Sequence, residues 1–186
     1  MKMDAGFLFL KQAYIHIDLW RIAFFTHVFT SMLVLIAGFS QFSTTLLQKK
    51  PKLHRTLGYI YVINILFVTG PAGLIMSFYA NGGIIARIAF VLLSILWIVF
   101  TAIAIYKAIK KDFVAHKQFM IRSYALTLSA ISLRSWKVII AKFTIMAPMD
   151  RYRLIAWLGW GLNLLIAEII ILQQVKRRMA KQQVVV

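Results

Sequence analysis

The stretch IIARIAFVLLSILWIVFTAIAIYK, residues 84–107, decides the fold of this chain. Before the closing Lys107, its only charged side chain is Arg87, which lies near its start. A helix needs about 20 consecutive apolar residues to cross the hydrocarbon core of a bilayer, which is roughly 30 Å thick. The stretch therefore predicts a helix that spans a membrane.

The composition of the whole chain indicates the same class of protein. Of the 186 residues, 61% are hydrophobic and 15% are charged, whereas soluble domains have about 45–50% apolar and about 25% charged residues. A chain this short cannot bury so much apolar surface in water. Disorder, a coiled coil, a disulfide-rich secreted fold and an ordinary cytosolic enzyme are excluded.

Several kinds of chemistry are also excluded. The absence of cysteine rules out disulfides, thiolate metal sites and iron–sulfur clusters. There is no G-x-S-x-G, H-E-x-x-H or P-loop motif, and five acidic residues offer few oxygen ligands to Mg²⁺ or Ca²⁺. We therefore expect neither a hydrolase nor a nucleotide-driven enzyme. If the protein is redox-active, we expect it to transfer electrons.

Long apolar runs recur along the chain and predict an all-α integral membrane protein. Short connections between the runs imply an up-down bundle of antiparallel helices, and Gly70-Pro71 predicts a kink in the second helix. Residues 1–18 are predicted to form an interfacial segment and residues 175–186 a basic tail. The five predicted transmembrane helices of the domain 19–174 cover residues 19–46, 57–79, 84–107, 118–141 and 152–174.

The formal net charge of +17 is unevenly distributed between the two ends of the bundle. The loops 49–55 and 107–117 and the tail hold 12 basic residues, and the opposite side holds 7. The positive-inside rule then places the C-terminus in the cytoplasm and the N-terminus outside. Because the basic residues lie at the ends of apolar runs, they predict contact with anionic lipid headgroups and not with nucleic acid.

A polar stripe runs along the fourth predicted helix. Polar side chains that face lipid cost several kcal/mol, so such a stripe should face the bundle interior, a cavity or a cofactor. The alternative is interhelical hydrogen bonding by Ser123 and Thr127, with His116 and Lys137 as interface anchors. The members recur every three or four residues, on one helical face: His116, Met120, Ser123, Thr127, Ala130, Arg134 and Lys137. His27, Ser31, Gly38, Gln41 and Thr45 form a similar stripe in the first helix.

Two histidines, His54 and His116, each precede a helix that starts on the cytoplasmic side. Two histidines at one depth on different helices suit a haem b, because each offers a neutral imidazole nitrogen to the iron. The basic residue that follows each one, Arg55 or Lys117, would pair with a haem propionate. The alternative is that both are interfacial histidines without a ligand.

Glu168 is the only acidic residue well inside a predicted helix. Arg122 lies a little over one turn into the fourth predicted helix from the same side. We predict a structural ion pair between Arg122 and Glu168, which would neutralise both charges. A proton relay through Glu168 and His116 is the alternative.

Two segments, HRTLGYIYV (54–62) and HKQFMIRSYAL (116–126), together with Leu133-Arg134 and Glu168, carry a family resemblance. They resemble a bacterial family of predicted membrane proteins that is known as domain of unknown function number 2306. The likeness covers the chain from His27 onward, with Phe119 where the family has Trp. It implies a multi-span protein of the bacterial inner membrane, without an established reaction. The positions that match the family pattern are His27, His54, His116, Arg122, Arg134 and Glu168.

Three functional hypotheses follow. The first is a haem b-binding or quinone-binding respiratory subunit for electron transfer, which helix count and histidine placement also liken to small haem-b membrane cytochromes. Its iron ligands would be His54 and His116, and its other cofactor-binding residues would be Arg55, Lys117, His27, Ser123, Thr127 and Arg134. The second is a cofactor-free structural or assembly subunit, whose partners are other membrane subunits or a second copy. The third is a small anion or proton transporter.

Overall fold

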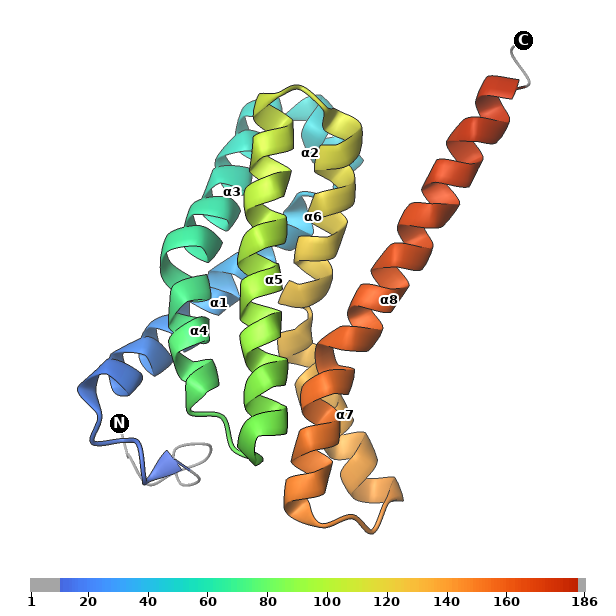
Figure 1. Cartoon of the computed structure of the whole chain (residues 1–186). Helices are drawn as coiled ribbons and strands as arrows, with labels where there is room; N and C mark the ends of the chain where they lie inside the picture. Colours follow the sequence, from blue (N-terminus) through green and yellow to red (C-terminus); the bar gives the residue numbers. More distant parts are fainter. Residues whose placement is uncertain (1–10, 184–186) are drawn as a thin grey trace. The chain divides into compact units, whose positions relative to one another are not determined.

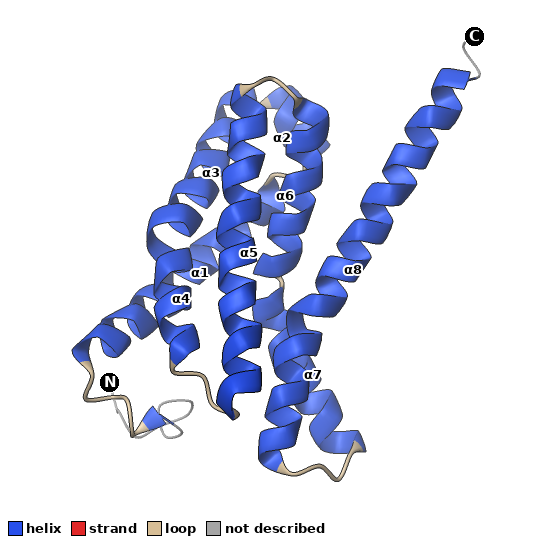
Figure 2. Cartoon of the chain, in the orientation of Figure 1, coloured by secondary structure: helices blue, strands red, loops and turns tan. Residues whose placement is uncertain are grey.

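The computed structural model describes residues 11–183, and in this part of the chain every regular element is a helix (Figures 1 and 2). The chain divides into two compact units, Met1–Ile95 and Leu96–Val186, with the boundary inside one helix. The elements are α1 (Asp18–Ser40), α2 (Thr44–Lys49), α3 (Pro51–Asn64), the π-helix η2 (Ile65–Thr69), α4 (Gly70–Phe78), α5 (Gly83–Ile109), α6 (Phe113–Thr127), α7 (Ser129–Phe143) and α8 (Pro148–Gln183).

Within residues 11–183, four helical segments are long and apolar enough to cross a membrane. They are Asp18–Ser40, Pro51–Phe78, Gly83–Ile109 and Pro148–Gln183. Each contains most of one predicted transmembrane helix. The exposed surface of these helices carries large apolar side chains such as Phe39, Phe67 and Leu172, as expected for helices whose solvent is lipid.

The fourth predicted helix, residues 118–141, is divided between α6 and α7. Each has 15 residues and is about 22 Å long at 1.5 Å per residue, which is less than the thickness of a hydrocarbon core. The chain stays helical through the break, because the Leu128 amide donates to the Tyr124 carbonyl at 2.9 Å and the Ser132 amide donates to the Leu128 carbonyl at 3.0 Å. The Thr127 hydroxyl donates to the Ser123 carbonyl at 3.1 Å, a contact that often bends helices.

At the C-terminal end, α8 remains helical to Gln183, so most of the predicted tail is helix. The predicted interfacial segment lies outside the described residues up to position 10, and residues 11–16 form turns.

In these turns, the buried Lys11 ammonium donates to the Tyr79 carbonyl and, at 2.8 Å, to Asn81 Oδ1. Burial, with a smaller contribution from Arg87, lowers the pKa of Lys11 to about 8.

The first unit is built around α1, which contacts α3, η2 and α4. Pro71 has no amide donor, and the helix before it widens into the π-turn Ile65–Thr69. Gly73 lets α1 approach α4, because a Cβ at this position would lie 3.0 Å from the His27 imidazole. The predicted kink at Gly70-Pro71 therefore coincides with a change of helix type and a close helix contact.

The second unit contains an antiparallel hairpin of α7 and α8 (Figure 1). A Cβ at Gly159 would lie 2.6 Å from Leu133 Cγ and 3.4 Å from its Cα, so only glycine allows this approach. Ala156, one turn earlier on α8, is fully buried. Small residues on α8 thus let the two helices pack closely, as is common in membrane proteins.

Candidate functional site

Two buried hydroxyl groups of α6 form hydrogen bonds with α5. Thr101 and Ser123 are fully buried, with their hydroxyl oxygens 2.7 Å apart. The Trp97 indole N–H donates to the Thr127 hydroxyl at 3.0 Å. Ser123 and Thr127, which were candidates for lining a cofactor site, thus form interhelical hydrogen bonds.

One amide side chain joins α8 to both α6 and α7. Asn163 Nδ2 donates to the Ala125 carbonyl of α6 at 3.1 Å, and Asn163 Oδ1 accepts from the Ser132 hydroxyl of α7 at 2.9 Å. Asn163 therefore bridges the break at Leu128. This position satisfies the donor and the acceptor of the amide within the protein, which avoids the cost of an unpaired polar group in lipid.

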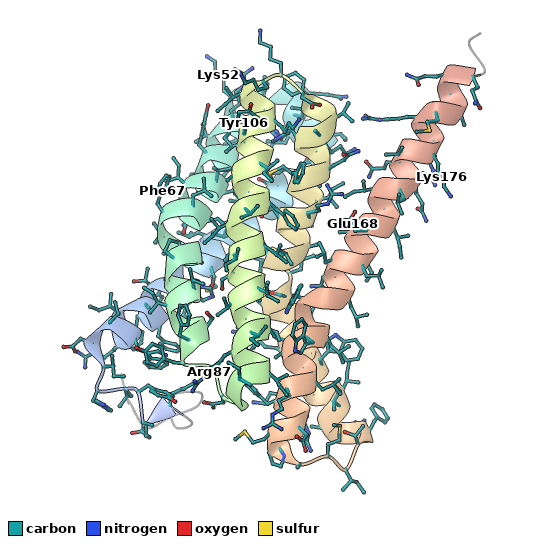
Figure 3. The ribbon with its side chains drawn as sticks, in the orientation of Figure 1. Lys52, Phe67, Arg87, Tyr106, Glu168 and Lys176 are labelled. Carbon is teal, nitrogen blue, oxygen red and sulfur yellow. The ribbon has the colours of Figure 1, made fainter. Side chains whose placement is uncertain are left out.

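Arg122 on α6 and Glu168 on α8 form a bidentate ion pair, and Figure 3 shows the position of Glu168 on α8. Arg122 Nε lies 2.6 Å from Glu168 Oε1, and Arg122 Nη2 lies 2.8 Å from Oε2. The guanidinium also lies over the Phe119 ring, 5.0 Å from its centroid. A bidentate pair of this geometry is strong, and it neutralises the two charges where the helices face each other.

His116, the fourth residue of α6, bonds to α5 through one ring nitrogen. Its Nδ1 lies 2.8 Å from the Ala104 carbonyl oxygen. Since a carbonyl only accepts, Nδ1 carries a proton in this contact, and Nε2 is the ring nitrogen that remains for a second partner. Asp112 precedes α6 and caps it, because its carboxylate accepts from the Ala115 amide at 3.1 Å. The same carboxylate contacts the Lys107 ammonium at 3.3 Å. Both interactions hold the pKa of the Asp112 carboxyl below its ordinary value.

The first unit contains a second polar cluster, at its π-turn. His27 Nδ1 donates to the Thr69 carbonyl at 3.0 Å, and the hydroxyl oxygens of Thr30 and Thr69 are 2.7 Å apart. The Thr69 hydroxyl also donates to Asn64 Oδ1. Side chains of α1 thus bond to a segment where the regular helical hydrogen-bond pattern is interrupted.

The predicted haem ligands lie in separate units, His54 in the first and His116 in the second. His54 is the fourth residue of α3, the same position that His116 has in α6, and its carbonyl accepts from Gln41 Nε2 at 3.3 Å. The basic side chains beside them, Arg55 and Lys117, are exposed. Among residues 11–183, no three His, Cys, Asp or Glu side chains come together as a metal site.

The polar stripe of the fourth predicted helix changes surroundings at the break. Ser123 and Thr127 are buried, but Arg134 and Lys137 on α7 are exposed. Arg134 Nη1 donates at 2.5 Å to the Ala130 carbonyl of its own helix. The structure therefore brings the first half of the stripe into the protein interior and leaves Arg134 on the surface of α7.

Sequence reasoning missed the residues of α5 that complete the buried contacts. Trp97 and Thr101 are four residues apart and so share a helical face. This spacing was a usable signal, because an indole N–H and a hydroxyl on one face of an apolar helix both need hydrogen-bond partners inside the protein. It could have identified the partners of Ser123 and Thr127.

We predict that the Arg122–Glu168 pair stabilises the fold as a unit. Arg122→Met or Glu168→Met leaves one charge unpaired near lipid and should lower the free energy of unfolding by about 1–3 kcal/mol. The double variant removes both charges and should recover part of this loss. Thermal unfolding in detergent, followed by tryptophan fluorescence, measures this coupling, and strictly additive losses would contradict it.

The comparisons with known proteins match the chain to a protein family, and no curated protein or solved structure matches it. The family model described as "Predicted membrane protein (DUF2306)" matches residues 24–171. This region includes all four helical segments that could cross a membrane, in whole or in large part, and every polar contact of α5, α6, α7 and α8 given above. The chain therefore belongs to the DUF2306 family of predicted membrane proteins, whose function is not known.

Proposed function

We propose that this protein is a structural or assembly subunit of a complex in the bacterial inner membrane, and that it works without a cofactor. The supporting observation is that polar side chains on facing helices of the second unit bond to one another. Thr101 pairs with Ser123, Arg122 pairs with Glu168, and Asn163 bridges α6 and α7. Such contacts are interhelical links worth roughly 1 kcal/mol each.

These links leave the outer surface of α8 apolar. Leu165, Ile166, Ile169 and Leu172 are all exposed on it. Lipid chains and apolar helices of other subunits can both cover such a surface, because the two are equally apolar. The proposed partners are therefore other membrane subunits or a second copy of this chain.

The subunit proposal predicts that the protein leaves its native membrane as part of a larger particle. After extraction in a mild detergent, light scattering with size exclusion should give a protein mass well above the 21.4 kDa of one chain. The particle should persist in high salt, because apolar contacts are not screened. A monomer of 21.4 kDa at every detergent concentration tested would overturn the proposal.

We further infer that the chain crosses the membrane five times, with the N-terminus outside and the C-terminus in the cytoplasm. The support is the helical connection through Leu128, which joins α6 and α7 into one broken helix of about 45 Å at 1.5 Å per residue. The same orientation puts the lysine-rich loops and the basic end of α8 on the cytoplasmic side, as the positive-inside rule requires.

Because the chain has no cysteine, single-cysteine variants test this topology directly. Five crossings predict that an impermeant maleimide added outside the cell labels Ile145→Cys and leaves Gln183→Cys unlabelled. If α6 and α7 do not cross, the pattern reverses. Ile84→Cys and Lys110→Cys serve as the outer and inner controls, since both topologies place them identically.

A haem b or quinone role in electron transfer is the second candidate, and the geometry of His116 favours it. Histidine ligands of metals usually donate their other ring N–H to a carbonyl or carboxylate, which fixes the ring and its tautomer. The bond from His116 Nδ1 to the Ala104 carbonyl has this form and leaves Nε2 as the ligand atom. The pairing of His116 with His54 stays a prediction from the sequence.

The haem candidate predicts a spectrum. Purified protein from haem-sufficient cells should show a Soret band, with α and β bands that sharpen on reduction by dithionite. His116→Ala and His54→Ala should each abolish the bands, and His16→Ala, at an exposed histidine before α1, should keep them. A folded protein without visible bands, from which solvent extracts no quinone, would overturn the haem and quinone candidate.

A further inference from the structure

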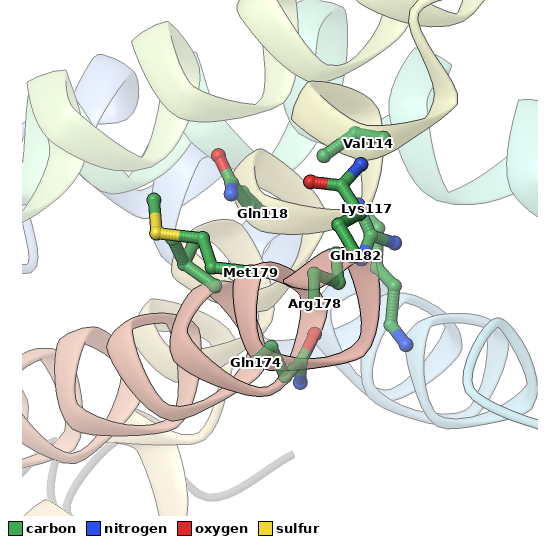
Figure 4. A pocket seen from close by; sticks show the side chains of 8 residues that line it. Val114, Lys117, Gln118, Gln174, Arg178, Met179 and Gln182 are labelled. Carbon is green, nitrogen blue, oxygen red and sulfur yellow. The ribbon is translucent and has the colours of Figure 1, made fainter. Parts of the chain in front are cut away.

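A cavity of about 210 Å³ lies between the start of α6 and the end of α8, entirely within the second unit (Figure 4). Its polar lining comes from both helices, with Lys117 and Gln118 on α6 and Gln174, Arg178 and Gln182 on α8. Met179 adds an apolar wall. The cavity is open on one side, so a ligand can enter without a rearrangement of the helices.

The cavity forms because α6 and α8 separate toward the C-terminal end of α8, as Figure 1 shows. The side chains that join the two helices become longer in the same direction. The short amide of Asn163 reaches the α6 backbone, and further along the helices the long side chains of Arg122 and Glu168 are needed to meet. Beyond this pair the cavity begins, one turn from Arg122 at Gln118.

The polar lining suits an anion. Two cations, Lys117 and Arg178, and three amide side chains that can donate hydrogen bonds surround the space, and no acidic residue lines it. Two carboxylates of the second unit are already engaged, Glu168 with Arg122 and Asp112 with Lys107 and the Ala115 amide. Guanidinium and ammonium groups combined with amide donors are the usual ligands of phosphate.

The location favours a phosphate carried by a lipid. The cavity lies at the end of the second unit that holds the lysine-rich loop 107–117. On α8, Lys176 (labelled in Figure 3) and Arg177 lie between the lining residues Val175 and Arg178 in the sequence. Basic pockets between transmembrane helices on the cytoplasmic side are typical sites for anionic headgroups. The apolar wall at Met179 suits the glycerol end of a lipid, where polar and apolar surfaces meet.

We propose that this cavity binds a phosphate group through Lys117 and Arg178, with an anionic phospholipid as the source. The inference uses the cytoplasmic orientation of the α8 end proposed above, but it holds equally for an assembly subunit and for a haem protein. Binding in the cavity differs from a general attraction of the basic end of α8 to a charged surface. Only two of the basic residues in this region, Lys117 and Arg178, line the cavity.

The test counts lipids on the full-length protein. Native mass spectrometry of protein from mixed micelles with phosphatidylcholine and phosphatidylglycerol should show one retained phosphatidylglycerol. The variant K117Q/R178Q should reduce its occupancy about tenfold or more. The matched control K176Q/R177Q removes the same charge from side chains outside the cavity and should retain the lipid.

The outcomes separate the site from its alternatives. Equal loss of lipid in both double variants, with unchanged unfolding temperatures, would show attraction to the basic helix end only and overturn the proposal. Inorganic phosphate is then added to lipid-free protein, with binding followed by thermal shift. If it saturates the wild type at low millimolar concentration and K117Q/R178Q fails to respond, free phosphate is the source and the lipid assignment fails.

Discussion

The structure depends on one constraint: a polar group that faces hydrocarbon must find its partner inside the protein. The second unit meets this constraint by pairing groups across helices. The hydroxyls of Thr101 and Ser123 pair with each other, and Arg122 pairs with Glu168 through two hydrogen bonds. These contacts set the rotation of α6 relative to α5 and α8, because each pair closes only when its two residues face each other. The packing of apolar side chains alone is less selective, since lipid is an equally good neighbour.

The two irregular segments are places where side chains from other helices compensate for a disturbed backbone. In the first unit, Pro71 follows a π-turn, and His27 and Thr30 of α1 bond to Thr69 in that turn. In the second unit, the helix breaks at Leu128, and Asn163 of α8 binds on both sides of the break. A break of this kind inside a membrane needs partners from a neighbouring helix. The irregularities are therefore held in place by the tertiary structure and are not loose points of the chain.

The sequence was sufficient for much of this arrangement, because burial in lipid is so selective. Hydropathy located the helices, and Glu168, as an acidic residue deep in an apolar run, pointed to Arg122 as its partner. The break at Leu128 was not predictable, since the three- and four-residue spacing continues through it and Leu128 keeps a helical backbone conformation. Arg134 consequently lies on the surface of α7 and not in the interior. The haem pairing of His54 and His116 depends on how two units are placed, which spacing along one chain does not determine.

The Arg122–Glu168 pair also controls the charge of the cavity beside it. Both residues lie about one to two turns from the cavity, so an unpaired Glu168 would offset the field of Lys117 and Arg178, and an unpaired Arg122 would draw an anion away from them. Because the two form a bidentate pair, neither leaves a net charge, and the positive field arises from the lining cations and the basic residues around them. The cavity begins about one turn beyond this pair, at Gln118 of α6. One interaction therefore joins the two helices and leaves the cavity beside it with a net positive lining.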